Sequence, residues 1–303
     1  MTDERLRLAF AGLHPERLAR LLEQHGPSRS LRMVLGATDG SFAWAAKGAS
    51  VDAAARREEL AGLGVATVFR GAPGYPHRLA AIPEPPDVLF VRGDIPDGQA
   101  VAVVGTRRCT AYGRSLATEY GAAIAAAGWV LVSGLARGID GAAHTGTVGA
   151  GGRGVAVLGC GPDILYPPEH RSLADRLVDA GGAVITEYPP GTVPEPWRFP
   201  PRNRIITGLV GALVVVEAAV TGGALISAGY ALIQGIPVLA VPGDVRRATS
   251  TGCNLLIRDG AHPVLDPDDL VEELSLILGP PPAVAAAAAA VAGTGDGRRG
   301  EAP

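Results

Sequence analysis

Short runs of apolar residues alternate with longer helical segments through the middle of the chain. The apolar runs fall near 100–104, 129–132, 154–158, 183–186, 212–216 and 237–241, with helical patterns near 113–127, 140–149, 169–180 and 224–234. Runs without polar alternation are typical of parallel strands that are covered on both faces. The pattern predicts an α/β fold with a doubly wound parallel sheet, whose ligands would bind beyond the carboxyl ends of the strands.

The flanking segments differ from this middle part in pattern and composition. Apolar residues near the N-terminus recur at helical spacing, whereas the stretch from Gly71 to Asp87 is interrupted by five prolines. Such a density of proline favours an extended connector, and the Ala-, Gly- and Pro-rich end of the chain has little to bury. We therefore predict a small helical domain at 1–70, a Pro-rich connector at 71–87, the sheet domain at 88–278 and a disordered tail at 279–303.

The charge pattern excludes a globally basic protein. The 303 residues carry 27 Lys+Arg and 30 Asp+Glu, a net charge of -3, although the middle block 100–260 holds 13 basic and 11 acidic side chains. A polyanion site would therefore be a local cluster of arginines. The spacing of Cys109, Cys160 and Cys253 matches no zinc module, and the N-terminus resembles no secretory signal. We expect no metal and a cytoplasmic protein.

Glycine, hydroxyl and arginine residues follow the first two predicted strands of this block. The first strand leads into Gly105, Thr106 and Arg107, and the second into Ser133 and Gly134. Glycine allows close backbone approach, a helix start attracts an anion, and arginine donors match phosphate oxygens. The first turn lacks the G-x-G-x-x-G spacing and no acid follows the second strand, so we expect no dinucleotide cofactor.

Later loops repeat this chemistry. Arg137 and Gly138 lead to Asp140, which we interpret as a helix cap, and Gly222 and Gly223 precede another predicted helix. No loop places a nucleophile beside a base, which favours binding over turnover. We therefore expect a protein that is not an enzyme and that needs no cofactor.

The most informative loop combines aromatic and basic side chains. Phe199, Arg202, Asn203 and Arg204 lie close together behind several prolines, with Trp197 just before them. Aromatic faces that stack bases and arginines that hold phosphates are what single-stranded nucleic acid binding needs. The alternative is a loop whose aromatic side chains fill the core while its arginines are solvated.

Taken together, the loops resemble the DprA/Smf family of DNA-processing proteins over about residues 75–265. The resemblance is carried by VAVVGTRRCTAYG, SGLARGIDGAAH, GCGPDILYPPEH, TEYPPG, FPPRNRIITGL, TGGALISAGYAL and GCNLLIRDGA. It implies a Rossmann-like domain that binds single-stranded DNA, forms a homodimer and helps load the RecA recombinase in natural transformation or recombination. It also implies that Arg107 and Arg171 contact DNA.

We therefore expect one DNA-binding groove and no membrane contact. The expected DNA-binding residues are Gly105, Thr106, Arg107, Ser133, Gly134, Arg137, Gly138, Arg171, Phe199, Arg202, Asn203, Arg204, Gly222 and Gly223. We further expect the largely apolar segment Leu225–Leu239 to form the homodimer contact.

The rival hypothesis is a Rossmann-like nucleotide-binding protein or a nucleoside-monophosphate hydrolase. TGGALISAGYAL resembles the Gly-Gly turn of such hydrolases. Those enzymes carry a glutamate one helical turn later, whereas the residues from Ala224 to Ala228 include no carboxylate. Hydrolysis is therefore the less favoured function.

Overall fold

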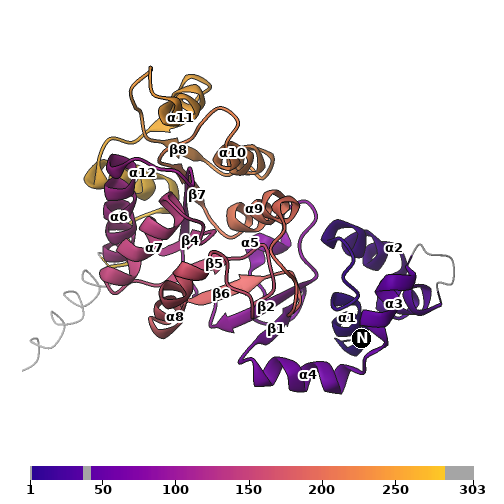
Figure 1. Cartoon of the computed structure of the whole chain (residues 1–303). Coiled ribbons are helices and arrows are strands. Elements are labelled where there is room, and N and C mark those ends of the chain that lie inside the picture. The colour runs from indigo at the N-terminus through magenta and orange to yellow at the C-terminus, as the bar shows by residue number, and fades with distance from the viewer. Residues whose placement is uncertain (1, 37–41, 284–303) are drawn as a thin grey trace, which may run out of the picture.

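A single mixed sheet organises the protein. The computed structural model describes residues 2–36 and 42–283, in which nine strands pair in the order β1-β2-β6-β5-β4-β3-β7-β8-β9 (Figure 1). The strands β3 to β9 pair in parallel. Their bounds are β3 (Ala100–Val104), β4 (Val130–Ser133), β5 (Gly154–Val157), β6 (Ala183–Thr186), β7 (Ala212–Val215), β8 (Val238–Ala240) and β9 (His262–Pro263).

The chain winds in both directions from β3. The strands β4, β5 and β6 follow on one side of β3, and β7 and β8 lie on its other side. The direction of winding therefore changes between β3 and β7, and at such a switch point the loops at the carboxyl ends of the strands leave a crevice. The predicted doubly wound, Rossmann-like fold is confirmed.

Helices cover both faces of the sheet, as the apolar strands require. Val101 and Val103 of β3 pack toward one face, and Ala102 and Val104 toward the other. The first face carries α6 (Ala111–Ala126), α7 (Ile139–Gly149), α8 (Arg171–Asp179) and α12 (Pro267–Leu278). The second carries α5 (His77–Ala80), α9 (Phe199–Gly208), α10 (Gly223–Ile233) and α11 (Ala248–Arg258). None of the helices in the described part of the chain is long and apolar enough to cross a bilayer.

The N-terminal helices lie beside the edge of the sheet that β1 and β2 form (Figure 1). They are α1 (Thr2–Ala9), α2 (Pro15–Leu35), α3 (Ala43–Ser50) and α4 (Ala53–Gly62). Buried Leu6, Phe10 and Leu60 pack with Phe90 of the sheet. This contact attaches the helices to the sheet edge.

Two local predictions need correction. Residues Ala66–Phe69 fall within the segment that the sequence predicts to be helical, but they form β1 and pair antiparallel with β2 (Val88–Gly93). The β-branched and aromatic residues Thr67, Val68 and Phe69 explain the strand. The connector also contains the short helix α5. The four domain boundaries stay predictions, and most of the predicted tail, from residue 284, lies outside the described residues.

Candidate nucleic-acid interface

A cleft of about 400 Å³ lies at the switch point of the sheet. Its walls come from the loop after β3, the start of α9 and the start of α10. Eight of the predicted site residues line it: Gly105, Thr106, Arg107, Phe199, Arg202, Asn203, Gly222 and Gly223. Loops far apart in the sequence thus meet where the fold leaves room for a ligand.

The loop after β3 is fixed to the end of β7 by Glu217. The backbone N–H of Thr106 donates to the Glu217 carbonyl oxygen at 2.7 Å. The Glu217 carboxylate accepts from the Thr110 N–H at 2.8 Å and from the Thr110 hydroxyl at 2.6 Å. A Cβ on Gly105 would lie 2.4 Å from the Ile139 side chain, so only glycine fits there. These contacts hold the turn in one conformation.

Arg107 and Phe199 form the part of the cleft that a ligand can reach from solvent. The Arg107 side chain is exposed, and its guanidinium carbon lies 4.8 Å from the centre of the Phe199 ring. Phe199 is half-buried and begins α9, where Pro200 and Pro201 occupy the first turn, the position that helices tolerate for proline. The guanidinium lies over the partly exposed ring, so a partner for a phosphate and an aromatic surface for a base are next to each other.

A buried arginine and a buried carboxylate form the floor. Arg202 and Asp140 are 3% and 6% exposed, and Arg202 donates to the Val157 carbonyl. Burial lowers the pKa of Arg202 to about 10, so it stays charged at neutral pH. Burial raises the pKa of Asp140, which the Arg202 charge opposes. The Asp140 carboxylate accepts from the Gly134 N–H at 3.1 Å. It therefore holds the loop after β4 against the floor of the cleft, and the N-cap of α7 is Gly138 instead.

The start of α10 closes the far side. Asn203 donates its side-chain amide to the Gly223 carbonyl at 3.3 Å, which connects α9 to this turn. Helix α10 has no acidic residue in its first turn, and its N-cap residue, Gly222, has no side chain that could accept from the first N–H groups. Its first N–H groups therefore add positive potential to the same cleft.

A narrow side pocket of about 20 Å³ continues past Phe199. Arg107, Phe199 and Tyr166 line it, together with the predicted residues Gly134 and Arg137. The Tyr166 and Phe199 rings are 5.7 Å apart, and the exposed Arg137 is paired with Glu169 at 3.0 Å. The side pocket thus extends the aromatic and basic surface toward the loop after β4.

Four predicted residues do not line the cleft. The buried Ser133 hydroxyl donates to the Val103 carbonyl at 2.6 Å, within the sheet. Gly138, with φ of +81°, supports the first turn, since a Cβ there would lie 2.3 Å from the Thr106 carbonyl oxygen. Arg171 is exposed at the start of α8. Arg204 is 3% exposed and makes a two-fold contact with buried Glu187 at 2.7 and 2.9 Å, so its donors already have a partner.

Sequence reasoning missed Arg108, Tyr166 and the role of Asp140. Arg108 lines the cleft and follows Arg107 directly, so its place in the same turn was the available signal. Tyr166 belongs to an already recognised Gly- and Pro-rich loop. The hydrogen bond from the Gly134 N–H to Asp140 depends on how the loop between β4 and α7 folds back on itself, and spacing alone did not reveal it.

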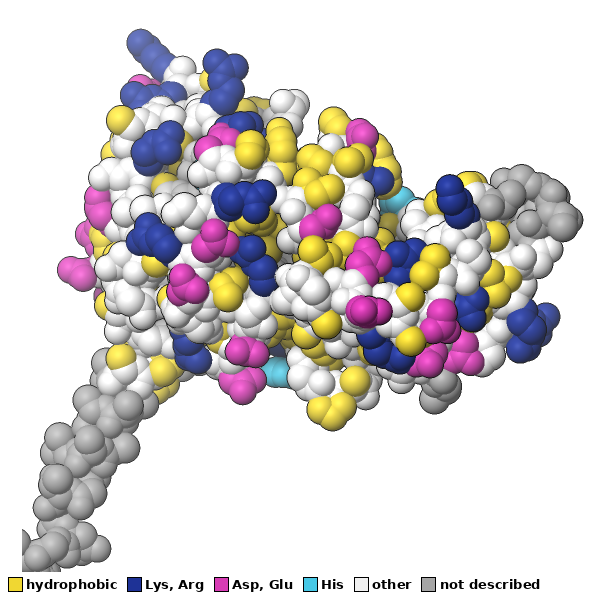
Figure 2. All heavy atoms as spheres, turned by 60° about the horizontal axis from the view of Figure 1, so that its bottom comes forward, with side chains coloured by type: hydrophobic (Ala, Val, Ile, Leu, Met, Phe, Trp, Pro, Cys, Tyr) yellow, Lys and Arg dark blue, Asp and Glu magenta, His cyan; other side chains and the backbone are white. Residues whose placement is uncertain are grey.

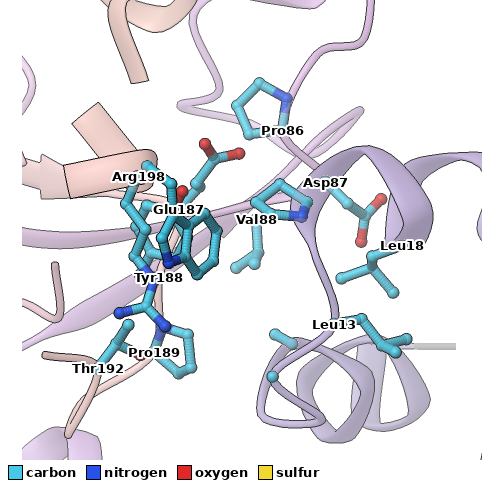
Figure 3. A pocket seen from close by; sticks show the side chains of 14 residues that line it. Leu13, Leu18, Pro86, Asp87, Val88, Glu187, Tyr188, Pro189, Thr192 and Arg198 are labelled. Carbon is cyan, nitrogen blue, oxygen red and sulfur yellow. The ribbon is translucent and has the colours of Figure 1, made fainter. Parts of the chain in front are cut away.

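A second pocket lies where the helical segment meets the sheet. It measures about 60 Å³, and Figure 3 shows Leu13 and Leu18 on one side and Tyr188 and Arg198 on the other. His14 stacks on Trp197 with 5.8 Å between ring centres, and Arg198 covers Trp197 at 4.5 Å. Trp197 therefore connects the helical segment to the turn that leads into Phe199.

The basic residues do not form a large field on the face shown in Figure 2, where dark blue and magenta side chains are interspersed. Within the residues that the structure describes, no group of three or more His, Cys, Asp and Glu side chains could hold a metal. The potential of the cleft comes instead from Arg107, Arg108 and the start of α10. The net charge of -3 predicts that a polyanion site is a local cluster of arginines, and Arg107 and Arg108 form such a cluster.

Fold and cleft together define a Rossmann-like protein with a crevice at its switch point that arginine, glycine and aromatic residues line. The chain belongs to the family of DNA recombination-mediator protein A, also called DprA/Smf, whose sequence profile matches residues 66–275. It is 40% identical over 224 residues to the Bacillus subtilis DNA processing protein DprA, covering 73% of this chain and 74% of that one. The Escherichia coli protein Smf is 40% identical over 202 residues, covering 66% of this chain and 54% of Smf.

Solved structures agree with this assignment. The Streptococcus pneumoniae DNA processing protein A matches with a TM-score of 0.73 and 31% identity, covering 88% of this chain and 95% of that chain. The Helicobacter pylori DNA processing protein A shares the fold with a TM-score of 0.61 at 24% identity, covering 69% of this chain and 95% of that chain. The Streptococcus pneumoniae match extends over most of this chain.

Proposed function

We propose that the cleft binds single-stranded DNA. The observation that carries the proposal is the exposed Arg107 guanidinium over the half-buried Phe199 ring, in a cleft that the α10 N-terminus also lines. Phosphates would contact Arg107 and Arg108, and a base would stack on Phe199. A duplex keeps its bases stacked inside and offers no ring to Phe199, so single strands are favoured.

Two relatives support this proposal. The Helicobacter pylori structure concerns the single-stranded DNA binding mode of that protein, and the Bacillus subtilis relative is a DNA processing protein. The interface that we propose comprises Gly105, Thr106, Arg107, Gly134, Arg137, Phe199, Arg202, Asn203, Gly222 and Gly223, with Arg171 as an outlying phosphate contact. We leave Ser133, Gly138 and Arg204 out of the contact set, because the structure gives them supporting positions.

The proposal extends to assembly and to a protein partner. We propose that the chain acts as a homodimer and helps load the RecA recombinase on single strands in natural transformation or recombination, without catalytic turnover. Leu232 and Ile233 of α10 are 80% and 67% exposed. Neighbouring large apolar side chains in water are typical of a surface that a partner covers, which supports the homodimer. Glu217, the carboxylate that precedes the Gly-Gly turn in the sequence, is engaged with Thr110 and is not free to act as a base.

The test is a titration with fluorescent oligothymidine and with a duplex of equal length at two salt concentrations. Tighter binding of the single strand, with an affinity that falls steeply with salt, is expected. Equal affinity for both forms, or the release of free base from nucleoside monophosphates in proportion to the protein, would contradict the proposal.

A further inference from the structure

Glu217 occupies the place where this class of fold ordinarily holds a phosphate. In doubly wound sheets, phosphates bind at the N-terminus of the helix that follows the first strand at the switch point, which here is α6. The Glu217 carboxylate is 3% exposed and lies against the start of that helix. It accepts from both the N–H and the hydroxyl of Thr110, the N-cap of α6.

The surrounding residues are adapted to this carboxylate. A Cβ on Gly113, in the first turn of α6, would lie 2.5 Å from the Glu217 carboxyl carbon, so glycine leaves the room that the carboxylate needs. The first turn of α6 contains no acidic residue of its own. The negative charge that complements the helix dipole therefore comes from the end of β7, through a side chain that is far away in the sequence.

We propose that Glu217 determines which nucleic-acid ligands this protein accepts, by filling the α6 phosphate position so that free nucleotides are rejected and a polynucleotide strand is selected. The inference rests on the proposed function. A mononucleotide depends on one well-held terminal phosphate, and the carboxylate excludes that phosphate by volume and by charge. A strand has many phosphodiesters and is held at Arg107, Arg108 and Phe199 instead.

This exclusion has a functional consequence. Free nucleotides are present wherever DNA is processed, and they would bind at an open phosphate site at the start of α6, to which the cleft loop 105–108 leads, and so compete with a strand. Because Glu217 occupies the start of α6, a free nucleotide can bind only at the exposed surface around Arg107. A single phosphate and a single base cover only part of that surface. Occupancy by a strand then becomes insensitive to the nucleotide concentration.

The experiment measures binding of thymidine monophosphate and inorganic phosphate to wild type and to Glu217→Ala, by calorimetry and by the shift in melting temperature. The variant opens space at Thr110, so we expect it to bind thymidine monophosphate at least ten-fold more tightly than wild type. Added phosphate should raise the melting temperature of the variant alone. The control Glu119→Ala removes an exposed carboxylate that belongs to α6 itself and accepts from Ser115, and this variant should gain no affinity for thymidine monophosphate.

Several outcomes would overturn the inference. One is a wild type that binds thymidine monophosphate as tightly as Glu217→Ala does, and another is an equal gain in Glu119→Ala. If Glu217→Ala does not fold even with phosphate present, competition on wild type decides. Displacement of oligothymidine by submillimolar mononucleotide would then contradict the inference, and resistance to displacement would support it. A wild type that fails to bind oligothymidine refutes the proposed function, whereas the nucleotide titration still tests Glu217.

Discussion

At the scale of single residues, Arg107 and Phe199 should contribute to DNA binding in different ways. Arg107→Ala removes about one phosphate contact, so the slope of log affinity against log salt should fall by about 0.7. Phe199→Ala removes a stacking surface and should cost about 1 to 3 kcal/mol with the slope unchanged. Oligothymidine titrations at several salt concentrations separate the two effects.

A matched control for these variants lies at the opposite edge of the sheet. Arg153 is exposed and directly precedes β5, so it is at the amino end of the strands, away from the cleft. Arg153→Ala should bind oligothymidine as wild type does. If folded Arg107→Ala also binds oligothymidine as tightly as wild type at 0.15 M salt, the cleft is not the DNA site. A thermal scan of Phe199→Ala checks separately that the variant is still folded.

Arg204, in contrast, should matter for stability. Its side chain and that of Glu187 are 4% and 2% exposed, and removing one partner leaves a buried charge without compensation. Arg204→Ala should therefore lower the free energy of unfolding by about 3 to 5 kcal/mol in chemical denaturation. Arg92→Ala breaks the more exposed pair with Asp175 and should cost less than about 1 kcal/mol. A fully stable Arg204→Ala would contradict this account.

His144 should make stability depend on pH. The side chain is fully buried, and burial lowers its pKa to about 3, against about 6.5 in an unfolded chain. The unfolded state thus takes up the proton first, and stability should fall as pH drops from 6.5 toward 3, by up to about 1.4 kcal/mol per pH unit. Comparing wild type with His144→Leu isolates this slope, and parallel pH profiles would exclude His144 as its source.

At the scale of elements, the contact between α6 and α7 depends on glycine. A Cβ on Gly146 would lie 1.9 Å from the Thr118 carbonyl oxygen, and one on Gly121 would lie 2.0 Å from the Ala143 carbonyl oxygen. Gly146→Ala must push the helices apart, and we expect it to destabilise the fold by about 1 to 3 kcal/mol.

The same helix provides the control. A Cβ on Gly149 would meet open space, with no neighbouring segment of the described chain within 4 Å, so Gly149→Ala should be neutral or stabilising by up to about 1 kcal/mol. Thermal unfolding of the two variants checks the pair. If Gly146→Ala melts at the wild-type temperature, the close approach of the two helices is not needed for stability.

The elements also show how far the sequence could lead. Strands such as β3 and β7 are buried on both faces, so their apolar runs were informative, and the loops after them led to Gly105, Arg107 and Gly222 at the cleft. β1 was missed because four residues at a sheet edge leave only a short signal. Arg204 was placed among the DNA contacts because composition cannot distinguish an arginine that faces a ligand from one that faces a buried Glu187.

At the scale of the whole molecule, the sheet and the helical segment should be coupled through Trp197. His14 and Arg198 flank its ring, and two residues later Phe199 lies in the cleft. Trp197→Ala should loosen the junction and increase cleavage of α1 to α4 by a protease, while the sheet stays folded. Bound oligothymidine should slow that cleavage in wild type. Unchanged cleavage in the variant would show that the contacts of Trp197 with His14 and Arg198 do not hold the two parts together.

Assembly is the last property at this scale, and α10 provides the test. Leu232 and Ile233 at the end of α10 are 80% and 67% exposed, and burying them against a second copy would remove two large apolar side chains from water. Leu232→Glu places a charge there, so sedimentation at micromolar concentration should show a dimer for wild type and a 30.8 kDa species for the variant. The cleft is formed by the other end of α10, so the variant should still bind a short oligothymidine. A monomeric wild type would contradict the proposed homodimer and leave the cleft unaffected.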